Sequence, residues 1–392
     1  MWSRASVAGM NEDVKDDPLK SAALEILESA WSDERGYCLP NAQVYPHMWL
    51  WDSCFHSIAW ASLHDERGIV ELSQVLRKQF SNGFLPHMVY AGPNDVYRGP
   101  VPGVSSFTQP PVYALAMAWV RQQGLRLPGY LPGKVSLALS YFTERRLRDG
   151  LAFVVHPWET GCDDSPRWDS WYGSTTWDAQ KWVDRDKQLV GTTEFSHDEG
   201  DAVWNKDFVC APSFFNAILS HAFLQASEFT GQPEQRRAGF ELGEAMDELL
   251  WDDSQGMYVD RPIVGAGDSH RAPTLDGVLS ALGAVRRDRA LACLDQLRDP
   301  ARFAAPFGLR YLPAAHPLYV PDGYWRGPAW PQLEFLAIQA CRRWGLDDLA
   351  AWLSERAKRG ITQSGWAEYW NPETGRGLGA RPQTWASLAA AM

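Results

Sequence analysis

The chain has 392 residues, of which 45% are hydrophobic and 22% are charged, proportions typical of a folded globular protein. Its formal net charge of −11 disfavours nucleic acid as a partner, and no apolar run approaches the roughly 20 residues needed to span a membrane. The six cysteines stand singly, so the sequence predicts neither a zinc site nor a disulfide framework. Because no signal peptide is recognisable, we expect a cytoplasmic location.

Helical periodicity and cap residues predict about twelve helices. The first has Asp17 as its N-cap and Pro18 at its first position, and its apolar residues continue to Trp31. Strand signals are few and short. The other eleven helices are expected over residues 52–63, 65–79, 110–123, 131–147, 213–229, 233–250, 274–282, 286–298, 329–344, 347–363 and 383–391.

The connections between these helices alternate between short and long, and the longest covers residues 152–212. Successive connections of antiparallel helices lie at opposite ends, so the alternation places every long loop on one face. Twelve helices arranged in this way predict an all-α (α/α)6 barrel with its site on the long-loop face. An α-solenoid is the alternative, but no sequence repeat supports it. We expect residues 1–16 to be disordered and residues 17–392 to form a single catalytic domain.

Three of the long loops carry dense clusters of aromatic and acidic residues, over 45–52, 156–169 and 365–372. The chain has 20 tryptophans, and such an excess often marks a surface that stacks on sugar rings. Hydrolysis of a glycosidic bond needs one carboxylic acid to protonate the leaving oxygen and one carboxylate to activate water or attack the sugar. Aromatic neighbours raise a carboxyl pKa by desolvation, which suits the first of these roles. The loops therefore indicate glycosidase chemistry.

These segments resemble the bacterial and archaeal members of glycoside hydrolase family 63, above all the mannosylglycerate and glucosylglycerate hydrolases, from Tyr45 to Trp385. The run Glu159-Thr160-Gly161-Cys162-Asp163 is similar to an E-S-G-x-D element whose last residue is the general acid. The run from Glu368 to Gly379 matches E-Y-x-N-P-x-T-G-x-G-x-G, whose first residue is the general base. The resemblance therefore implies that Asp163 is the acid and Glu368 the base.

The resemblance also implies binding residues in the same loops. Residues 49–52 are similar to the family's W-L-W-D, residues 108–111 to its T-Q-P-P turn, and residues 324–330 to its Y-W-R-G-P-x-W element. Asp52 also suits the N-cap of a helix, and Arg326 also suits a brace between loops. Together with Trp168 of the aromatic-rich loop, the candidate substrate-binding residues are Tyr45, Trp49, Trp51, Asp52, Gln109, Trp168, Tyr324, Trp325, Arg326, Trp330 and Gln383.

Two residues depart from the family pattern, namely Cys162, which precedes the acid, and Asp164, which follows it. A second carboxyl beside Asp163 could shift the pKa of that residue. We expect no metal and no cofactor, because the histidines and acidic residues show no ligand spacing.

The sequence thus predicts an inverting α-glycosidase that hydrolyses a small α-glucoside or α-mannoside, with glucosylglycerate or mannosylglycerate as first candidates. The alternatives are a disaccharide phosphorylase or sugar epimerase on the same barrel, and a non-catalytic sugar-binding protein. The expected partner is a small carbohydrate, and the oligomeric state is left open. The carboxylate of a glycerate leaving group calls for a cation or several neutral donors, and the sequence leaves open Arg98, Arg167, Arg185, Lys187 and Arg381.

Overall fold

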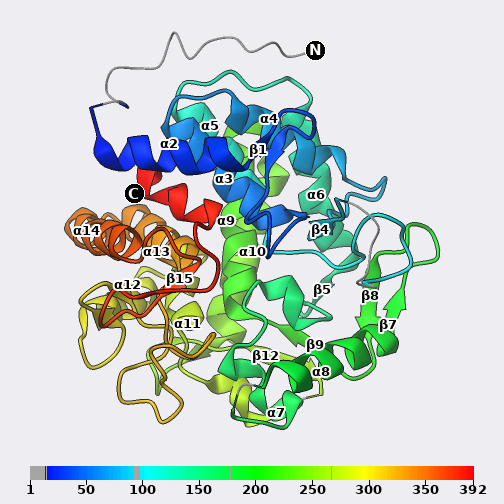
Figure 1. The fold of residues 1–392 in the computed structure, drawn as a ribbon. Helices are drawn as coiled ribbons and strands as arrows, with labels where there is room; N and C mark the ends of the chain where they lie inside the picture. The colour runs from blue at the N-terminus through cyan, green and yellow to red at the C-terminus, as the bar shows by residue number, and fades with distance from the viewer. Residues whose placement is uncertain (1–13, 15, 92–97, 177, 266) are drawn as a thin grey trace.

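The structure is a computed structural model that describes residues 14, 16–91, 98–176, 178–265 and 267–392, so most of the expected disordered segment 1–16 lies outside it. Helices around a hydrophobic core dominate the described chain (Figure 1). The main α-helices are α2 (Pro18–Ala30), α3 (Leu50–Ser62), α4 (Arg67–Arg77), α5 (Tyr113–Gln122), α6 (Leu131–Arg145), α7 (Asp169–Tyr172), α8 (Ala179–Thr192), α9 (Ser213–Thr230), α10 (Pro233–Leu249), α11 (Leu275–Leu279), α12 (Arg287–Asp295), α13 (Pro331–Arg343) and α14 (Asp347–Gln363).

All twelve predicted helices are present, with ends displaced by at most three residues. Asp17 caps α2 as expected, because its side chain accepts hydrogen bonds from the amides of Leu19 and Lys20. The eighth and ninth helices end in the 3-10 turns η5 (Ser280–Leu282) and η6 (Gln296–Arg298), and the twelfth is the 3-10 helix η7 (Thr384–Ala391).

The prediction that residues 152–212 are only a loop is wrong, since this segment contains α7 and α8. Asp178 is the N-cap of α8 and accepts a hydrogen bond from the amide of Lys181 at 3.0 Å. Along its 14 residues α8 buries only Trp182, Leu189 and Val190. Because the segment is mostly polar and its apolar residues are few, its sequence is interpreted as part of the long loop.

Six helices pack side by side in a closed series. The helix α3 packs against α5, α5 against α9, α9 against α11 and η5, η5 against α13, α13 against η7, and η7 again against α3. The other helices lie outside this series: α2 on η7, α4 on α3, α6 and α10 on α9, α12 on η5, and α14 on α13. Every residue of α3 is buried, whereas α14 buries one face, which agrees with an inner and an outer set.

The strands are short antiparallel pairs that lie in the loops. Their bounds are β1 (Trp31–Ser32), β2 (Tyr37–Cys38), β3 (Met48–Trp49), β4 (Met88–Val89), β5 (Leu147–Arg148), β6 (Leu151–Ala152), β7 (Thr193–Phe195), β8 (Ala202–Asn205), β9 (Val209–Ala211), β10 (Trp251–Asp252), β11 (Met257–Tyr258), β12 (Arg261–Val264), β13 (Ala304–Ala305), β14 (Gly308–Leu309), β15 (Tyr369–Trp370) and β16 (Gly377–Leu378). Two pairings, β3 with β4 and β9 with β12, join different long loops.

Backbone hydrogen bonds complete a circle among the six long loops. Besides the two strand pairings, the joining contacts are Ala202 N to Ser106 O, Leu275 N to Tyr311 O, Ala329 N to Trp370 O, and Thr384 N to Pro40 O, where Leu275 and Thr384 are the first residues of α11 and η7 after their loops. Each long loop is thereby bonded to the next, which agrees with the prediction that they share one face.

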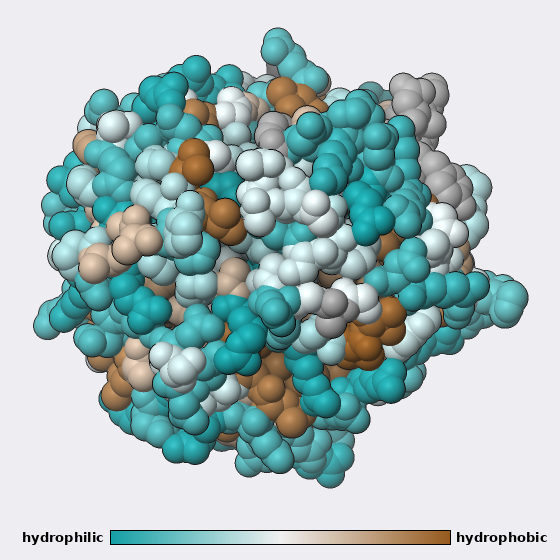
Figure 2. Space-filling view, turned by 90° about the horizontal axis from the view of Figure 1, so that it is seen from below, coloured by the Kyte–Doolittle hydropathy of each residue, from teal (hydrophilic) through white to brown (hydrophobic). Residues whose placement is uncertain are grey.

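The outer surface is mainly hydrophilic in the view from below, where hydrophobic side chains form small separate patches (Figure 2). Every helix in the described part of the chain is too short or too polar to cross a membrane.

A buried ion pair joins the loop before α9 to its neighbours. Glu159 accepts hydrogen bonds from Nη1 and Nη2 of Arg146 at 3.1 and 2.9 Å, and neither side chain is exposed. The same carboxylate accepts hydrogen bonds from the amides of Thr108 at 3.2 Å and Val155 at 2.7 Å. A buried charge persists only when it is paired and hydrogen bonded. Glu159 stands four residues before Asp163, and it therefore links the loop of the proposed acid to the segments of Thr108 and Arg146.

We expect Glu159→Gln to lower the free energy of unfolding by about 3–5 kcal/mol, because the substitution leaves the Arg146 guanidinium buried without a counter-charge. Urea unfolding followed by circular dichroism measures the change. The control is Glu241→Gln, which removes an exposed pair with Arg237 at 3.7 Å and should leave the unfolding midpoint unchanged. Equal midpoints for Glu159→Gln and the parent protein would contradict the importance of the buried pair.

Candidate active site

Glu368 stands at the base of the β15–β16 hairpin with both carboxylate oxygens fixed. Its Oε1 accepts a hydrogen bond from the Tyr45 hydroxyl at 2.7 Å, and its Oε2 accepts one from the Ala380 amide at 2.9 Å. Gly379 has a φ of +68°, and a Cβ there would lie 2.4 Å from Oε2 of Glu368. The last glycine of the E-Y-x-N-P-x-T-G-x-G-x-G run is therefore required for the carboxylate to fit.

Asp163 is partly exposed, and the backbone before it is tightly held. Gly161 ends the 3-10 turn η2 (Pro157–Thr160) with a φ of +70°, and a Cβ there would lie 2.3 Å from the Trp51 ring. The Trp168 indole donates a hydrogen bond to the carbonyl of Cys162 at 3.0 Å. Trp51 and Trp168 are both buried, so in this structure they position the loop that carries Asp163.

Burial raises the pKa values of both carboxyl groups. It raises the pKa of Asp163 to about 6, although the nearby Arg98 charge opposes the shift. It also raises the pKa of Glu368, where hydrogen bonds from Ala380 and Tyr45 favour the ionised form and the charge of Asp163 adds to the increase. Because the charge of Asp163 affects the pKa of Glu368, the two carboxyl groups lie in one electrostatic environment.

The expected effect of Asp164 is not found. The pKa of Asp163 is set by burial and by Arg98, whereas Asp164 adds to the raised pKa values of Tyr324 and Tyr369, for which burial is the main cause. The second acid therefore acts on the aromatic wall of the site.

A cavity of about 780 Å³ opens between four of the long loops. Tyr45, Tyr324, Arg326 and Glu368 line it, as do residues of the segments 44–45, 175–176, 317–326 and 368–380. A cavity of this size can enclose a small sugar derivative.

Stacked aromatic rings lie beside this cavity. The Trp325 and Trp330 rings stack with centroids 4.0 Å apart, and Tyr369 stacks on Trp330 at 4.4 Å. Trp325 has a φ of +53°, a conformation that costs roughly 1–3 kcal/mol in a residue with a side chain. The buried indole nitrogens of Trp49, Trp325 and Trp330 have no hydrogen-bond partner among the described residues. Such unpaired donors are expected where a polar ligand completes the site.

Residues 45–386 match the family model described as a mannosylglycerate hydrolase MGH1-like glycoside hydrolase domain. The chain belongs to this glycoside hydrolase family. It is 27% identical to a mannosylglycerate hydrolase of Thermus thermophilus, over 94% of this chain and 98% of the relative. It is 28% identical to a glucosylglycerate hydrolase of Mycolicibacterium hassiacum, over 88% of this chain and 91% of the relative.

A solved structure of the family 63 mannosylglycerate hydrolase from Thermus thermophilus, in complex with Tris and D-glycerate, matches with a TM-score of 0.80. The identity is 25%, and the match covers 95% of this chain and 99% of that structure. The resemblance to family 63 inferred from the sequence is thus confirmed, and the protein is a glycoside hydrolase with the helical fold of these relatives.

Three of the predicted binding residues of this hydrolase, Asp52, Gln109 and Gln383, are buried. Asp52 is the third residue of α3, whose N-cap is Trp49, so the alternative that Asp52 caps the helix is wrong. Burial raises the pKa of Asp52 to about 7, against the opposing charge of His56. Gln109 accepts a hydrogen bond from the Trp51 amide at 3.2 Å, and the buried Oε1 of Gln383 has no partner among the described residues.

Two arginines near the site form buried salt bridges. Arg326 binds Asp169 through two hydrogen bonds, at 2.8 and 2.6 Å. Arg167 lies 2.7 Å from Asp260 and 3.2 Å from Asp276. Both guanidinium groups therefore hold loops of the hydrolase together, and this geometry supports the interpretation of Arg326 as a brace.

An acidic residue that was not predicted from the sequence, Asp186 of α8, lies near Asp163. The Tyr172 hydroxyl donates a hydrogen bond to Asp186 at 2.7 Å, and Nε2 of His156 lies 3.8 Å from the same carboxylate. Burial raises the pKa of Asp186 to about 7, and the charge of Asp163 adds to this effect. The helix that carries this residue is mostly polar, and its segment is expected from the sequence to be part of a loop.

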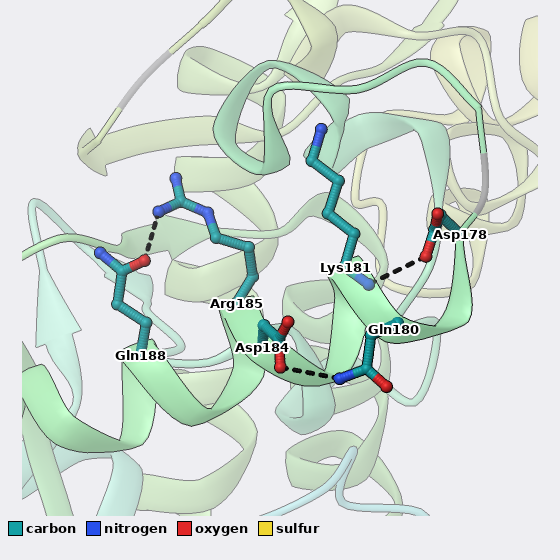
Figure 3. A pocket seen from close by; sticks show the side chains of 6 residues that line it. All are labelled: Asp178, Gln180, Lys181, Asp184, Arg185 and Gln188. Carbon is teal, nitrogen blue, oxygen red and sulfur yellow. Dashed lines mark hydrogen bonds between the residues drawn. The ribbon is translucent and has the colours of Figure 1, made fainter.

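A second, shallow depression of about 380 Å³ follows α8 (Figure 3). Its polar groups bond to one another: Arg185 donates to Gln188 at 2.6 Å, and Gln180 donates to Asp184 at 2.9 Å. The lining residues come from one helix and its N-cap, so this depression is a solvated helix surface without the aromatic wall of the larger cavity.

One cluster of potential metal ligands occurs within the described ranges. The ligand atoms of Cys38, His56 and Glu71 lie within 4.8 Å of one another, and all three residues are buried. Nδ1 of His56 is already hydrogen bonded to Glu71 at 2.7 Å, and its Nε2 is bonded to Thr384. We interpret the cluster as a hydrogen-bonded link between α3, α4 and η7.

The two raised pKa values predict that kcat/KM has a bell-shaped pH dependence, with its maximum on the acidic side of neutrality. Activity should fall as the pH rises through about 6, because the acid role that the family resemblance implies for Asp163 requires a protonated carboxyl. It should also fall at lower pH, because the base role implied for Glu368 requires an ionised carboxylate. A pH–rate profile measures both limbs, and constant activity up to pH ~8 would contradict the assignment of Asp163.

The variant Tyr45→Phe tests the acidic limb of this profile, because it removes the hydrogen bond that lowers the pKa of Glu368. Its acidic limb should move to higher pH by roughly one pH unit, while the alkaline limb stays in place. Circular dichroism across the same range controls for unfolding.

Proposed function

We propose that this hydrolase cleaves a small α-glucoside or α-mannoside, with glucosylglycerate and mannosylglycerate as the first candidates, and inverts the anomeric configuration. The observation that carries the proposal is a pair of carboxyl groups from distant loops, both with raised pKa values, of which Glu368 lines an aromatic-walled cavity and is affected by the charge of Asp163. The relatives named as mannosylglycerate and glucosylglycerate hydrolases support it. Their names favour hydrolysis over phosphorolysis, epimerisation or binding without catalysis.

In this proposal Asp163 donates a proton to the glycosidic oxygen, and its raised pKa keeps it protonated up to a pH of about 6. Glu368 takes a proton from water, which attacks the anomeric carbon from the opposite side. Tyr45 and Ala380 orient Glu368 through its two oxygens. Inversion requires room for this water, so we expect the carboxyl groups to stand roughly 6.5–9.5 Å apart.

The sugar is proposed to bind between the aromatic wall and the end of α3. The unpaired indole N–H groups of Trp49, Trp325 and Trp330 are suited to donate hydrogen bonds to hydroxyl oxygens. Asp52 and Gln383 supply acceptors for hydroxyl protons. Each hydroxyl group of a sugar can both donate and accept a hydrogen bond, so a sugar satisfies both kinds of group.

We also propose that residues 17–392 form one catalytic domain with the (α/α)6-barrel architecture. The closed series from α3 through α5, α9, η5 and α13 to η7 supports this arrangement, as does the circle of bonded long loops. In such a barrel the inner helices begin on the long-loop face, where the proposed catalytic residues lie.

We expect Asp163→Asn and Glu368→Gln each to lower kcat by about 10²–10⁴-fold with little change in substrate affinity, because both groups act mainly in the transition state. Steady-state kinetics on glucosylglycerate and mannosylglycerate measure the loss. The matched control is Asp322→Asn, which alters a cavity carboxylate bound to Arg376 and should retain activity within a few fold. Full activity in either catalytic variant would contradict its assigned role.

The proposed stereochemistry predicts that the first sugar released from an α-linked substrate is the β-anomer. Proton NMR of the earliest turnovers distinguishes the anomers before they interconvert. An α-anomer as first product would require Glu368 to attack the sugar directly, and inversion would then be wrong.

A further inference from the structure

Arg98, in the loop before α5, is held by aromatic rings beside the proposed acid. Its guanidinium carbon lies 3.8 Å from the centroid of the Trp158 ring and 5.8 Å from that of Trp49. Its Nη1 lies 3.3 Å from Nε2 of His87. Its buried Nε has no hydrogen-bond partner among the described residues. The faces of the two tryptophan rings thus hold the guanidinium group in place, and its Nε–H has no acceptor among the described residues.

The other arginines of this region are bonded to carboxylates or to neutral oxygens, although the Nε of Arg185 and that of Arg326 also lack a partner among the described residues. Arg167 and Arg326 form the buried salt bridges described above. Arg185 donates to Gln188 and to the carbonyl of Trp171, each at 2.6 Å. For Arg98, by contrast, no carboxylate in the described ranges comes within salt-bridge distance. A cation taken out of water is costly unless an anion pairs with it, so a ligand anion would complete this site.

Arg98 lies on the acid side of the proposed site. Its charge opposes the raised pKa values of Asp163 and Asp186, whereas it is not among the causes that shift the pKa of Glu368. The general acid of a glycosidase protonates the leaving oxygen, so the leaving group lies on the same side as the acid. Burial also lowers the pKa of His87 well below its usual range, so this neighbour is neutral and brings no second positive charge.

We propose that Arg98 binds a carboxylate of the leaving group, and thereby gives this hydrolase its preference for glycosides with an anionic aglycone. The proposal rests on the proposed glycosidase function. Stacking on Trp158 fixes the guanidinium plane, and the Nε with a neighbouring Nη forms a fork that matches the two oxygens of a carboxylate. In glucosylglycerate the carboxyl carbon is bonded to the carbon that carries the glycosidic oxygen. Arg98 and Asp163 would therefore act on neighbouring groups of the same aglycone.

The test compares two substrates that differ only in this charge: glucosylglycerate, and glucosylglycerol, in which a hydroxymethyl group replaces the carboxylate. Arg98→Gln should lower kcat/KM for glucosylglycerate by about 10–100-fold, mainly through KM, and change kcat/KM for glucosylglycerol less than about three-fold. Assays at a pH of about 5 keep Asp163 protonated with or without Arg98 and keep the glycerate ionised. Arg98→Lys, which retains the charge without the fork, should recover part of the loss.

Arg185→Gln is the matched control, because it removes an arginine that also lies near a tryptophan ring, 5.1 Å from that of Trp171, but is already hydrogen bonded. It should leave the preference between the two substrates unchanged. Equal losses on both substrates in Arg98→Gln would reduce Arg98 to a brace and overturn the proposal. Loss of the preference in Arg185→Gln alone would also overturn it.

D-glycerate binding separates this proposal from the proposed function. If the parent protein hydrolyses neither substrate, the glycosidase assignment to these sugars fails, and isothermal titration with D-glycerate still tests Arg98. Binding to the parent that weakens by about 10-fold or more in Arg98→Gln supports the anion site. Absence of binding, or equal binding to both proteins, overturns it.

Discussion

The buried carboxylate of Glu159 is the interaction on which the geometry of the site depends. It receives hydrogen bonds from two nitrogens of Arg146 and from the amides of Thr108 and Val155. A charge that is completely removed from water needs such donors, and here they come from the end of α6, from the loop before α5 and from the loop of Glu159 itself. The position of Asp163 is therefore linked to the end of α6 and to the loop before α5.

Desolvation acts on both proposed catalytic carboxyl groups, but their immediate contacts differ. Glu368 accepts hydrogen bonds from Tyr45 and from the Ala380 amide, which favour its ionised form. For Asp163 the opposing influence is the charge of Arg98 rather than a hydrogen bond from another residue. The fixed and hydrogen-bonded carboxylate suits a base, and the carboxyl whose pKa desolvation raises to about 6 suits an acid. The environments thus agree with the roles that the family resemblance implies.

Close backbone approaches explain why two short runs have little freedom to vary. At Gly161 a side chain would collide with the Trp51 ring, and at Gly379 it would collide with the carboxylate of Glu368. Both positions also have positive φ angles, which glycine adopts without steric cost. Each glycine therefore allows a functional group to approach the backbone, and neither contact is visible in the local sequence.

The sequence by itself determined the helices and the alternation of short and long connections, because both depend on local periodicity, caps and spacing. It also identified Asp163 and Glu368 as candidates, through runs that resemble the family. Only the tertiary structure decided which groups meet, such as Tyr45 with Glu368 and Arg326 with Asp169, which are far apart in the chain. It also showed that Arg167 and Arg326 are paired with carboxylates, and it revealed α8, a mostly polar helix in a segment expected to be a loop. Local patterns report how a segment folds, whereas the pairing and pKa of a side chain depend on neighbours that distant segments bring to it.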